Sequence, residues 1–523
     1  MRLTPRFLFA AVGLLFVSAS PSPSPTVNPY TFTFRLSGEP ATLDWNLAHT
    51  NIETYVLMNL MEGLVSFDQD MRVAPALAQT WTRSQDGKTY TFKLRPGVKW
   101  SDGVPLKAKD FLNSWRRLLS PLTAASYAYF LFDIEGAQEF NRGVLKDFDR
   151  VGVKAPDDQT LVVKLKEPVA HWIYMPTFWV TFPIRQDLID KFGNGWTKPG
   201  NLVTLGPFTL FAYDIDAKII MKANPLYAGA RGNIQEVSAL IVKDDATALN
   251  LYESGRLDFL AEISTLDLKR LANRADLKTF PYLKTGYLGF KTTKHPASNV
   301  KVRRAISMAI DKAKIGQILH GGQEPATTFV PPGVFAYERQ GGLKYDPVAA
   351  KRELSASGEF AARTLKMELL TPNWDKQLTL AQFIQAELKK NLNIEVSVQP
   401  FDHKTFRAQL DLHAHPFYEA NWGADYPDPD NFLSVFLGNS GNNRNNWKNA
   451  RYDELVLKAR FETKTEKRAQ YYAEAQKILL EQDAVIVPLY YEPNKALVRS
   501  RVKGFRLNPL NYMYLGKVYV DGK

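Results

Sequence analysis

The segment 421–429 combines residue types that could contact a ligand. It reads Asn-Trp-Gly-Ala-Asp-Tyr-Pro-Asp-Pro, so a tryptophan, a tyrosine and two carboxylates stand among small residues after an apolar stretch. A carboxylate such as Asp425 could receive a cation, and Trp422 could pack against an apolar group. Taken alone, however, the pattern fits a turn that begins at Asp425 and a core position for Trp422 better than a binding site.

Three histidines are the candidates for a metal site. His413 and His415 would lie on one face of a strand, and His403 precedes His413 by ten residues. Imidazole nitrogens bind transition metals, so the three side chains together could hold one. Surface histidines on a strand, or on the approach to one, explain the spacing more simply. We therefore predict no metal site and no cofactor.

Familiar enzyme motifs are missing from the sequence. The chain has no His-Glu-x-x-His helix and no Gly-x-Ser-x-Gly elbow. Residues 87–89 read Gly-Lys-Thr, like the end of a phosphate-binding loop, but Thr82 stands where that loop requires glycine. The aspartates of 425–430 lack the glycine and the distal glutamate of a calcium loop. The sequence therefore favours a non-catalytic protein.

Composition and charge narrow the class of protein further. The 523 residues are 45% hydrophobic and 23% charged, which is typical of a globular protein and argues against disorder. The absence of cysteine excludes disulfides, thiolate metal sites and lipid attachment through a cysteine. The net charge of +12 invites a nucleic-acid interpretation. Because the basic residues are scattered along the chain, we predict no nucleic-acid partner.

The N-terminus has the pattern of a secretory signal. Arg2 and Arg6 precede an apolar run at 7–17, and small residues follow at the position of cleavage. We therefore expect a signal peptide at 1–19, followed by a Ser/Pro linker at 20–28. An uncleaved membrane anchor is the alternative interpretation. A signal peptide would direct the protein to the periplasm or the cell envelope.

Strand and helix patterns alternate along the rest of the chain, and more regularly beyond about residue 280. This alternation predicts α/β lobes rather than a sandwich or a bundle. A long helix is expected at about 454–480 and a helix at 55–64. The other expected segments are strands at 31–36, 90–94, 161–165, 218–222, 365–370, 394–398 and 485–489, and helices at 110–119, 300–310, 346–358 and 380–388.

Five blocks of the chain carry a resemblance to a known family. They are YTFKLRPGVKWSDGVPLKAKDFLNSW (90–115), VRRAISMAIDKAKIGQIL (302–319), NLNIEVSVQPFD (391–402), ANWGADYPDPDNFL (420–433) and DAVIVPLYYEPNKALV (483–498). In this order they resemble the peptide/nickel-binding family (family 5) of bacterial extracellular solute-binding proteins, which are receptors of ABC importers. The last block resembles the oligopeptide-binding type in particular.

The resemblance implies an α/β, two-lobed fold like that of the type II periplasmic binding proteins, with an extra subdomain in the first lobe. The lobes would be joined by a hinge and would close on the ligand. Lobe I would be discontinuous, and lobe II would be a single stretch. The implied division is 29–50, 175–280 and 490–523 for the core of lobe I, 51–174 for the extra subdomain and 281–489 for lobe II.

The resemblance also implies a set of ligand contacts. Asp425 stands where oligopeptide binders carry the aspartate that receives the ligand's α-ammonium group, which is mostly charged at neutral pH. Trp422 would line a side-chain pocket. Main-chain contacts would carry most of the affinity, because a peptide laid as an added strand satisfies its own amides. The other expected contacts are Tyr127 and Tyr129 on the extra subdomain, Glu53 near the N-terminal ligand segment, Tyr426 and Glu419.

Glu419 marks a departure from the family pattern. Some oligopeptide binders carry an arginine at this position, which meets the ligand's carboxylate. A carboxylate at Glu419 would repel the carboxyl end of a peptide, and Gln377 stands where relatives have a histidine. Another cation, or a longer, amidated or basic ligand, is therefore expected.

The sequence thus predicts a monomeric receptor that delivers oligopeptides to an ABC permease in the membrane. Two alternatives stay open. Within the same family, the ligand could instead be a nickel chelate, haem or a cationic metabolite, an idea that rests on His413, His415 and Glu419. Outside it, the acidic residues of the chain leave open an envelope hydrolase.

Overall fold

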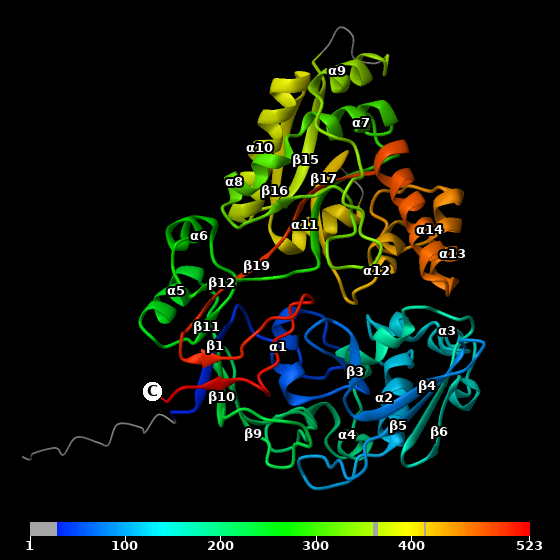
Figure 1. Cartoon of the computed structure of the whole chain (residues 1–523), viewed down its shortest axis with the longest axis vertical. Helices are drawn as coiled ribbons and strands as arrows, with labels where there is room; N and C mark the ends of the chain where they lie inside the picture. Colours follow the sequence, from blue (N-terminus) through cyan, green and yellow to red (C-terminus); the bar gives the residue numbers. More distant parts are fainter. Residues whose placement is uncertain (1–28, 359–363, 413–414, 523) are drawn as a thin grey trace, which may run out of the picture.

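The computed structural model describes residues 29–358, 364–412 and 415–522. Two lobes are stacked along the long axis of the molecule, each built on its own β-sheet (Figure 1). The predicted signal peptide and the Ser/Pro linker lie outside the described residues. Within the described part of the chain, no helix combines the length and the apolar character needed to cross a membrane.

Lobe I is built on a seven-stranded sheet. Its central strand β1 (Thr31–Leu36) is buried along its whole length and runs parallel to both neighbours, β10 (Glu236–Ile241) and β11 (Phe259–Leu260). The remaining strands are β8 (Phe208–Asp214), β9 (Lys218–Ala223), β12 (Leu277–Phe280) and β19 (Asn494–Val498), in the order β12-β19-β11-β1-β10-β9-β8. The helices of this part are α1 (Asn51–Leu60), α4 (Gln186–Phe192), α5 (Asp245–Glu253) and α6 (Thr265–Leu271).

A subdomain with a four-stranded antiparallel sheet adjoins the seven-stranded sheet. Helix α2 (Ala108–Leu119) packs on β6 and β7, and its Trp115 meets Trp172 edge-on with 6.4 Å between ring centroids. Both indoles are fully buried, so they anchor the core of the subdomain. Its elements are β4 (Ala78–Arg83), β5 (Thr89–Leu94), β7 (Thr160–Lys164) and β6 (Val153–Asp157), in that order, with the short α3 (Ala137–Asn141) and the ribbon of β2 (Val65–Phe67) and β3 (Val73–Pro75).

Lobe II is built on a six-stranded mixed sheet. Its strands, in spatial order, are β14 (Glu324–Pro325), β18 (Ile486–Tyr491), β13 (Lys284–Phe290), β17 (Phe417–Gly423), β15 (Lys366–Pro372) and β16 (Glu395–Phe401). The helices are α7 (Val300–Ala309), α8 (Ile315–Leu319), α9 (Pro347–Ser355), α10 (Asp375–Leu392), α11 (His403–Asp411), α12 (Pro429–Leu433), α13 (Ala450–Phe461) and α14 (Thr465–Lys477).

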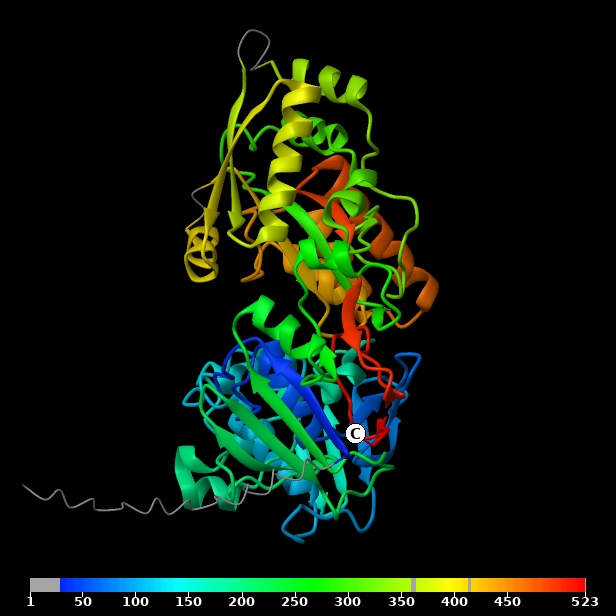
Figure 2. The same cartoon turned by 90° about the vertical axis from the view of Figure 1, so that its left-hand side faces the viewer.

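Two short connections join the lobes. The chain leaves the seven-stranded sheet after β12 and enters the six-stranded sheet at β13, so only residues 281–283 lie between the two strands. It returns from β18 to β19 through residues 492–493. In Figure 2 the C-terminal part of the chain, in red, runs from lobe II down into lobe I. Connections this short act as hinges when lobes move as rigid bodies.

The structure corrects two of the helices expected from the sequence. Helix α1 begins at Asn51 rather than at residue 55, because Thr50 and Glu53 form a capping box that satisfies its first amide groups. The single helix expected at about 454–480 is divided into α13 and α14, with an extended residue at Glu462. The break lets the two helices pack against each other, which one continuous helix could not do.

Candidate functional site

Asp425 lies in the loop between β17 and α12 and is half-buried. Its backbone N–H donates to Asn431 Oδ1 at 3.1 Å, and the Asn431 amide reaches Asp425 Oδ2 at 3.5 Å. Burial raises the pKa of Asp425 to about 7, and the Asn431 hydrogen bond offsets only part of this. No cation is ion-paired with this carboxylate within the described residues, so a cationic group can bind there.

Tyrosines of lobe I lie opposite Asp425. Tyr127 and Tyr129 belong to the subdomain, and their rings stack at a centroid distance of 5.6 Å. Tyr512, on the C-terminal tail, is buried. The pKa of each of these three hydroxyls is raised, first by burial and further by the nearby charge of Asp425. The structure therefore brings the Asp425 loop of lobe II next to aromatic groups from two separate parts of lobe I.

Arg407 supplies a positive charge to the same region. It lies on α11 of lobe II, and its side chain is exposed. Its charge lowers the pKa of Tyr127, while burial and Asp425 raise that pKa. The pKa of Tyr127 is therefore influenced by both a carboxylate and a guanidinium. We call Asp425, Trp422, Tyr127, Tyr129, Tyr512 and Arg407 the interlobe site.

Trp422 and Tyr426 flank Asp425 but differ in accessibility. Trp422, the next-to-last residue of β17, is half-buried, and its Nε1 donates to Asn431 Oδ1 at 3.0 Å. Tyr426 is buried, and its hydroxyl donates to Asp430 Oδ2 at 2.9 Å. Its ring also stacks on His171 of the subdomain, with 5.1 Å between centroids. Trp422 therefore keeps a partly accessible surface, whereas Tyr426 is held among protein groups.

Glu419 is only 3% exposed, on the buried part of β17. The Thr371 hydroxyl donates to its Oε2 at 2.8 Å. Burial raises the pKa of Glu419 to about 8, so the side chain is mostly uncharged at neutral pH. The repulsion of a peptide carboxylate that the sequence led us to expect is therefore largely absent. Gln377 is buried as well.

Glu53 lies within α1, not ahead of it, and is 1% exposed. Its two carboxylate oxygens accept from the backbone N–H groups of Ala41, at 3.1 Å, and of Thr50, at 2.8 Å. These bonds cap the helix and fix the segment that precedes it. A direct contact of Glu53 with ligand remains a prediction.

A buried network of charges joins the two lobes directly behind the Asp425 loop. Arg460 on α13 donates to Asp133 of the subdomain at 2.8 Å and to Asp430 of lobe II at 3.1 Å. Burial alone would raise the pKa of Asp430, but Arg460, His171, the Tyr426 hydrogen bond and Arg468 together hold that pKa below its usual range. We call this set the ionic network: Asp133, His171, Asp428, Asp430, Arg460 and Arg468.

Histidine and arginine complete the ionic network. Arg468 donates to Asp428 Oδ1 at 2.6 Å, and His171 Nε2 lies 3.4 Å from Asp430 Oδ2. Burial lowers the pKa of His171, although Asp430 opposes this change. Asp428 and Asp430 are thus bound to cations of the protein, which explains the acidic segment that resembled a calcium loop by number alone.

The histidines considered for a metal lie partly outside the described residues. His413 and the side chain of His403 are not among the described parts of the structure. His415 precedes β17, and its Nδ1 lies 3.1 Å from Glu368 Oε2. Among the residues that the structure describes, no cluster of three or more histidine, aspartate and glutamate side chains could hold a metal ion.

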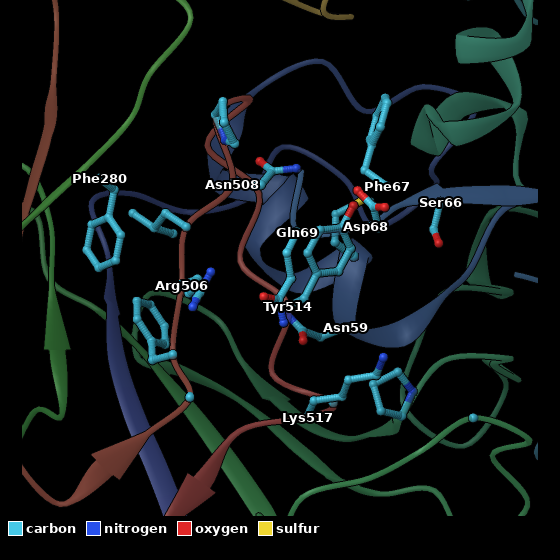
Figure 3. A pocket seen from close by; sticks show the side chains of 18 of the residues that line it. Asn59, Ser66, Phe67, Asp68, Gln69, Phe280, Arg506, Asn508, Tyr514 and Lys517 are labelled. Atoms are coloured by element: carbon cyan, nitrogen blue, oxygen red, sulfur yellow. The ribbon is translucent and has the colours of Figure 1, made fainter. Parts of the chain in front are cut away.

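A separate pocket of about 1560 Å³ lies in lobe I (Figure 3). It is formed by the C-terminal end of α1, the ribbon of β2 and β3, the end of β12 and the C-terminal tail. None of the residues expected from the sequence to contact ligand lines it.

Several groups of the interlobe site and of the ionic network gave no signal in the sequence. Arg407 lies on a helix that we did not expect, although Asp402 caps its first turn through two backbone amides. Tyr512 and Asp133 are single residues without a motif. Asp133 is separated from Arg460 by 327 positions. Only the folded chain brings such residues together.

Comparison with known families supports the resemblance found in the sequence. The profile described as "Bacterial extracellular solute-binding proteins, family 5 Middle" matches residues 72–444. The chain is 32% identical to the probable deoxycholate-binding periplasmic protein YgiS of Escherichia coli, with 96% of this chain and 97% of that protein covered. It is also 32% identical to the periplasmic oligopeptide-binding protein OppA of Salmonella typhimurium, with 90% and 88% covered.

Solved structures have the same fold. The murein tripeptide-binding protein MppA of Escherichia coli matches with a TM-score of 0.82 at 29% identity, over 94% of this chain and 99% of that chain. OppA of Haemophilus influenzae in complex with RPPGFSPFR matches with a TM-score of 0.80 at 29% identity, over the same shares of the two chains. The α/β, periplasmic-binding-protein-like fold expected from the sequence is therefore confirmed.

Proposed function

Because the chain belongs to the family 5 bacterial extracellular solute-binding proteins, a family of non-enzymatic receptors that bind solutes for ABC importers, we propose that its own ligands are short peptides. The peptide is held between the two lobes at the interlobe site. It is then delivered to a permease in the membrane. The family relation supports the class of function, and the charges of the interlobe site support the choice of ligand.

The observation that carries this proposal is the pair of opposite charges around Tyr127. Asp425 raises the pKa of the Tyr127 hydroxyl and Arg407 lowers it, so both charges act within the same small region. A peptide with free ends carries an ammonium group and a carboxylate at neutral pH. We assign the ammonium group to Asp425 and the carboxylate to Arg407.

The aromatic groups of the interlobe site fit varied side chains. Tyr127 and Tyr129 stack on each other, and Trp422 keeps a partly accessible indole face. Such rings accept many apolar groups without demanding one shape, and ordered water adapts to polar groups. Glu419 is mostly neutral and therefore does not oppose a peptide carboxylate.

We also propose that the lobes move about the segments 281–283 and 492–493. Lobe II would comprise about 281–489, and the remainder would move with lobe I. The ionic network lies between the lobes, so its Asp133–Arg460 pair stabilises the closed arrangement. The chain has no cysteine for lipid attachment, and its relatives include periplasmic proteins. We place the mature protein in the periplasm, where it acts as a monomer.

A bile acid is the second candidate ligand. One relative at 32% identity is named as a probable deoxycholate-binding protein. The exposed Arg407 could receive a bile-acid carboxylate, and the rings of Tyr127 and Trp422 could contact the steroid. This ligand has no ammonium group, so it would leave Asp425 without a partner.

Two measurements test the proposal. Native mass spectrometry of the purified protein, followed by denaturation, identifies any retained ligand; short peptides support the proposal, and a steroid favours the second candidate. Calorimetry then compares trialanine with trialanine amide. Arg407→Gln should weaken trialanine binding about tenfold or more and leave the amide nearly unchanged, because only trialanine has a carboxylate.

Lys404→Gln is the matched control, because Lys404 is an exposed cation on the same helix. It should leave both affinities unchanged. An equal loss for trialanine and its amide in Arg407→Gln would reject the assignment of the carboxylate. No binding of any peptide by the wild-type protein would reject the proposed ligand class.

A further inference from the structure

The pocket in lobe I is large, and aromatic side chains form part of its lining. Its volume of about 1560 Å³ exceeds the roughly 300–1,000 Å³ of most small-molecule sites. Phe67 of β2, Phe280 at the end of β12 and Tyr514 of the C-terminal tail line it, as Figure 3 shows. Met58 and Phe505 add further apolar surface. An elongated apolar molecule can therefore lie along this part of the lining.

Cations without an ion-pair partner surround the lining. Arg95, Lys278, Arg506 and Lys517 all line the pocket, and none of them forms an ion pair within 29–358, 364–412 and 415–522. Figure 3 shows Arg506 and Lys517 on different sides of it. By contrast, Arg274, which also lines the pocket, is paired with Asp276. The pocket therefore has an excess of uncompensated positive charge.

Three carboxylates line the pocket, Glu62, Asp68 and Asp276, so they are fewer than its seven cations. Glu62 accepts a hydrogen bond from the Tyr227 hydroxyl, and burial raises its pKa. Asp68 accepts from the backbone N–H groups of Asp70 and Arg72, at 2.8 and 2.9 Å, so it closes its own turn. The charges of Arg95 and Lys517 both lower the pKa of Glu62, so both cations lie on the side of the pocket that Glu62 lines.

We propose that this pocket is a second binding site, for an organic anion with an apolar body. The anionic head is bound by Arg95 and Lys517, and the apolar body lies over Phe67 and Tyr514. An organic acid that enters a partly buried pocket needs positive charges close to its head group, because an uncompensated charge is costly there. Fatty acids and anionic membrane lipids share this chemistry.

The pocket and the interlobe site are distinct. Asp425, Tyr127 and Arg407 do not line the pocket. The two regions adjoin at the C-terminal tail, where Tyr512 lies near Asp425 and Tyr514 lines the pocket. Binding of an anion in lobe I therefore does not depend on the peptide proposal, and each can fail without the other.

Fluorescence titration with 8-anilinonaphthalene-1-sulfonate, an aromatic anion, tests the proposal on the full mature chain, and laurate then serves as the competitor. The wild-type protein should bind one probe molecule that laurate displaces and that trialanine does not. The double variant Arg95→Gln/Lys517→Gln should weaken the probe at least tenfold. Phe67→Asp, which puts a carboxylate into the pocket, should abolish binding.

The matched control removes two exposed cations of lobe II, in the double variant Lys351→Gln/Lys390→Gln, and should change the probe affinity less than twofold. Thermal unfolding of every variant establishes that it is folded. Unchanged probe affinity in both pocket variants, or displacement of the probe by trialanine, would overturn the proposal. Co-sedimentation with phosphatidylglycerol vesicles distinguishes a membrane lipid from a soluble anion. If the wild-type protein binds the vesicles and Phe67→Asp does not, the ligand is a lipid. If the wild-type protein does not bind the vesicles, the ligand is a soluble anion.

Discussion

The pKa of Asp425 predicts a specific dependence of peptide affinity on pH. Asp425 must be ionised to bind an ammonium group, and its pKa in the free protein is about 7. The α-amino group of a peptide must be protonated, and its pKa is about 7.7–8.0. Affinity should therefore be highest near pH 7.5 and fall on both sides. Below about pH 7 the Asp425 carboxylate takes up a proton, and peptide binding must release that proton.

The size of the fall follows from the two ionisation equilibria. With a pKa of about 7 for Asp425 and about 8 for the ligand amine, roughly 0.6 of encounters at pH 7.5 have both groups charged. At pH 5 that fraction is about 0.01, so the affinity for trialanine should drop about 60-fold. At pH 6 the expected drop is about sixfold.

Calorimetry of trialanine binding from pH 5 to 7.5 measures this fall directly. Asp425→Asn should bind more weakly at pH 7.5, by about 2–5 kcal/mol, since it leaves the ammonium group without its counter-charge. It should also lose the dependence on pH between 5 and 7. N-acetylated trialanine, which has no ammonium group, should show no acid fall in the wild-type protein.

The same variant reports on folding. The raised pKa of Asp425 adds stability that is present below its unfolded value near 3.8 and is lost as the pH rises through about 7. Asp425→Asn without ligand should therefore unfold at a higher temperature than the wild-type protein at pH 8, and near pH 4 the two should agree. Wild-type affinity that stays constant from pH 5 to 7.5, or an acid fall that persists in Asp425→Asn, would refute the reasoning.

Two further variants test other parts of the site. Glu419→Gln should leave trialanine affinity unchanged at pH 7. In thermal and denaturant unfolding, the stability of the wild type should fall relative to that of the variant by about 1.4 kcal/mol per pH unit between about pH 4.5 and 8. Parallel pH profiles of stability would contradict a neutral Glu419. Asp133→Asn should weaken trialanine about 5- to 30-fold, or about 1–2 kcal/mol, through faster release in stopped-flow experiments, because the Arg460 pair between the lobes is lost. Unchanged affinity and release rate would mean that this pair does not stabilise the closed arrangement.

Much of the fold is visible in the sequence because it depends on neighbouring residues. The period-two pattern of 31–36 and the helical pattern of 300–310 need no distant contact to be recognised, and both segments form the expected elements, β1 and α7. The blocks around Asp425 and Trp422 pointed to a receptor family in the same way. The long helix expected at about 454–480 failed because its break, at Glu462, carries no glycine or proline.

Charge states and pairings could not be predicted from the sequence. From the sequence alone Glu419 would be expected to carry a negative charge, yet burial makes its side chain mostly neutral at pH 7. Arg407 and Tyr512 have no motif, and their role depends on which side of the interface they occupy. Asp133 forms an ion pair with Arg460, from which it is separated by 327 positions in the chain.

The sequence by itself determined that the chain is an α/β protein of a receptor family, and it predicts Asp425 as a ligand contact. Only the tertiary structure decided which groups surround Asp425, how acidic it is, and that a second, cation-lined pocket exists in lobe I. The physical reason is that secondary structure follows local periodicity. A pKa, an ion pair and a pocket instead depend on the solvent excluded by segments that are remote in the chain.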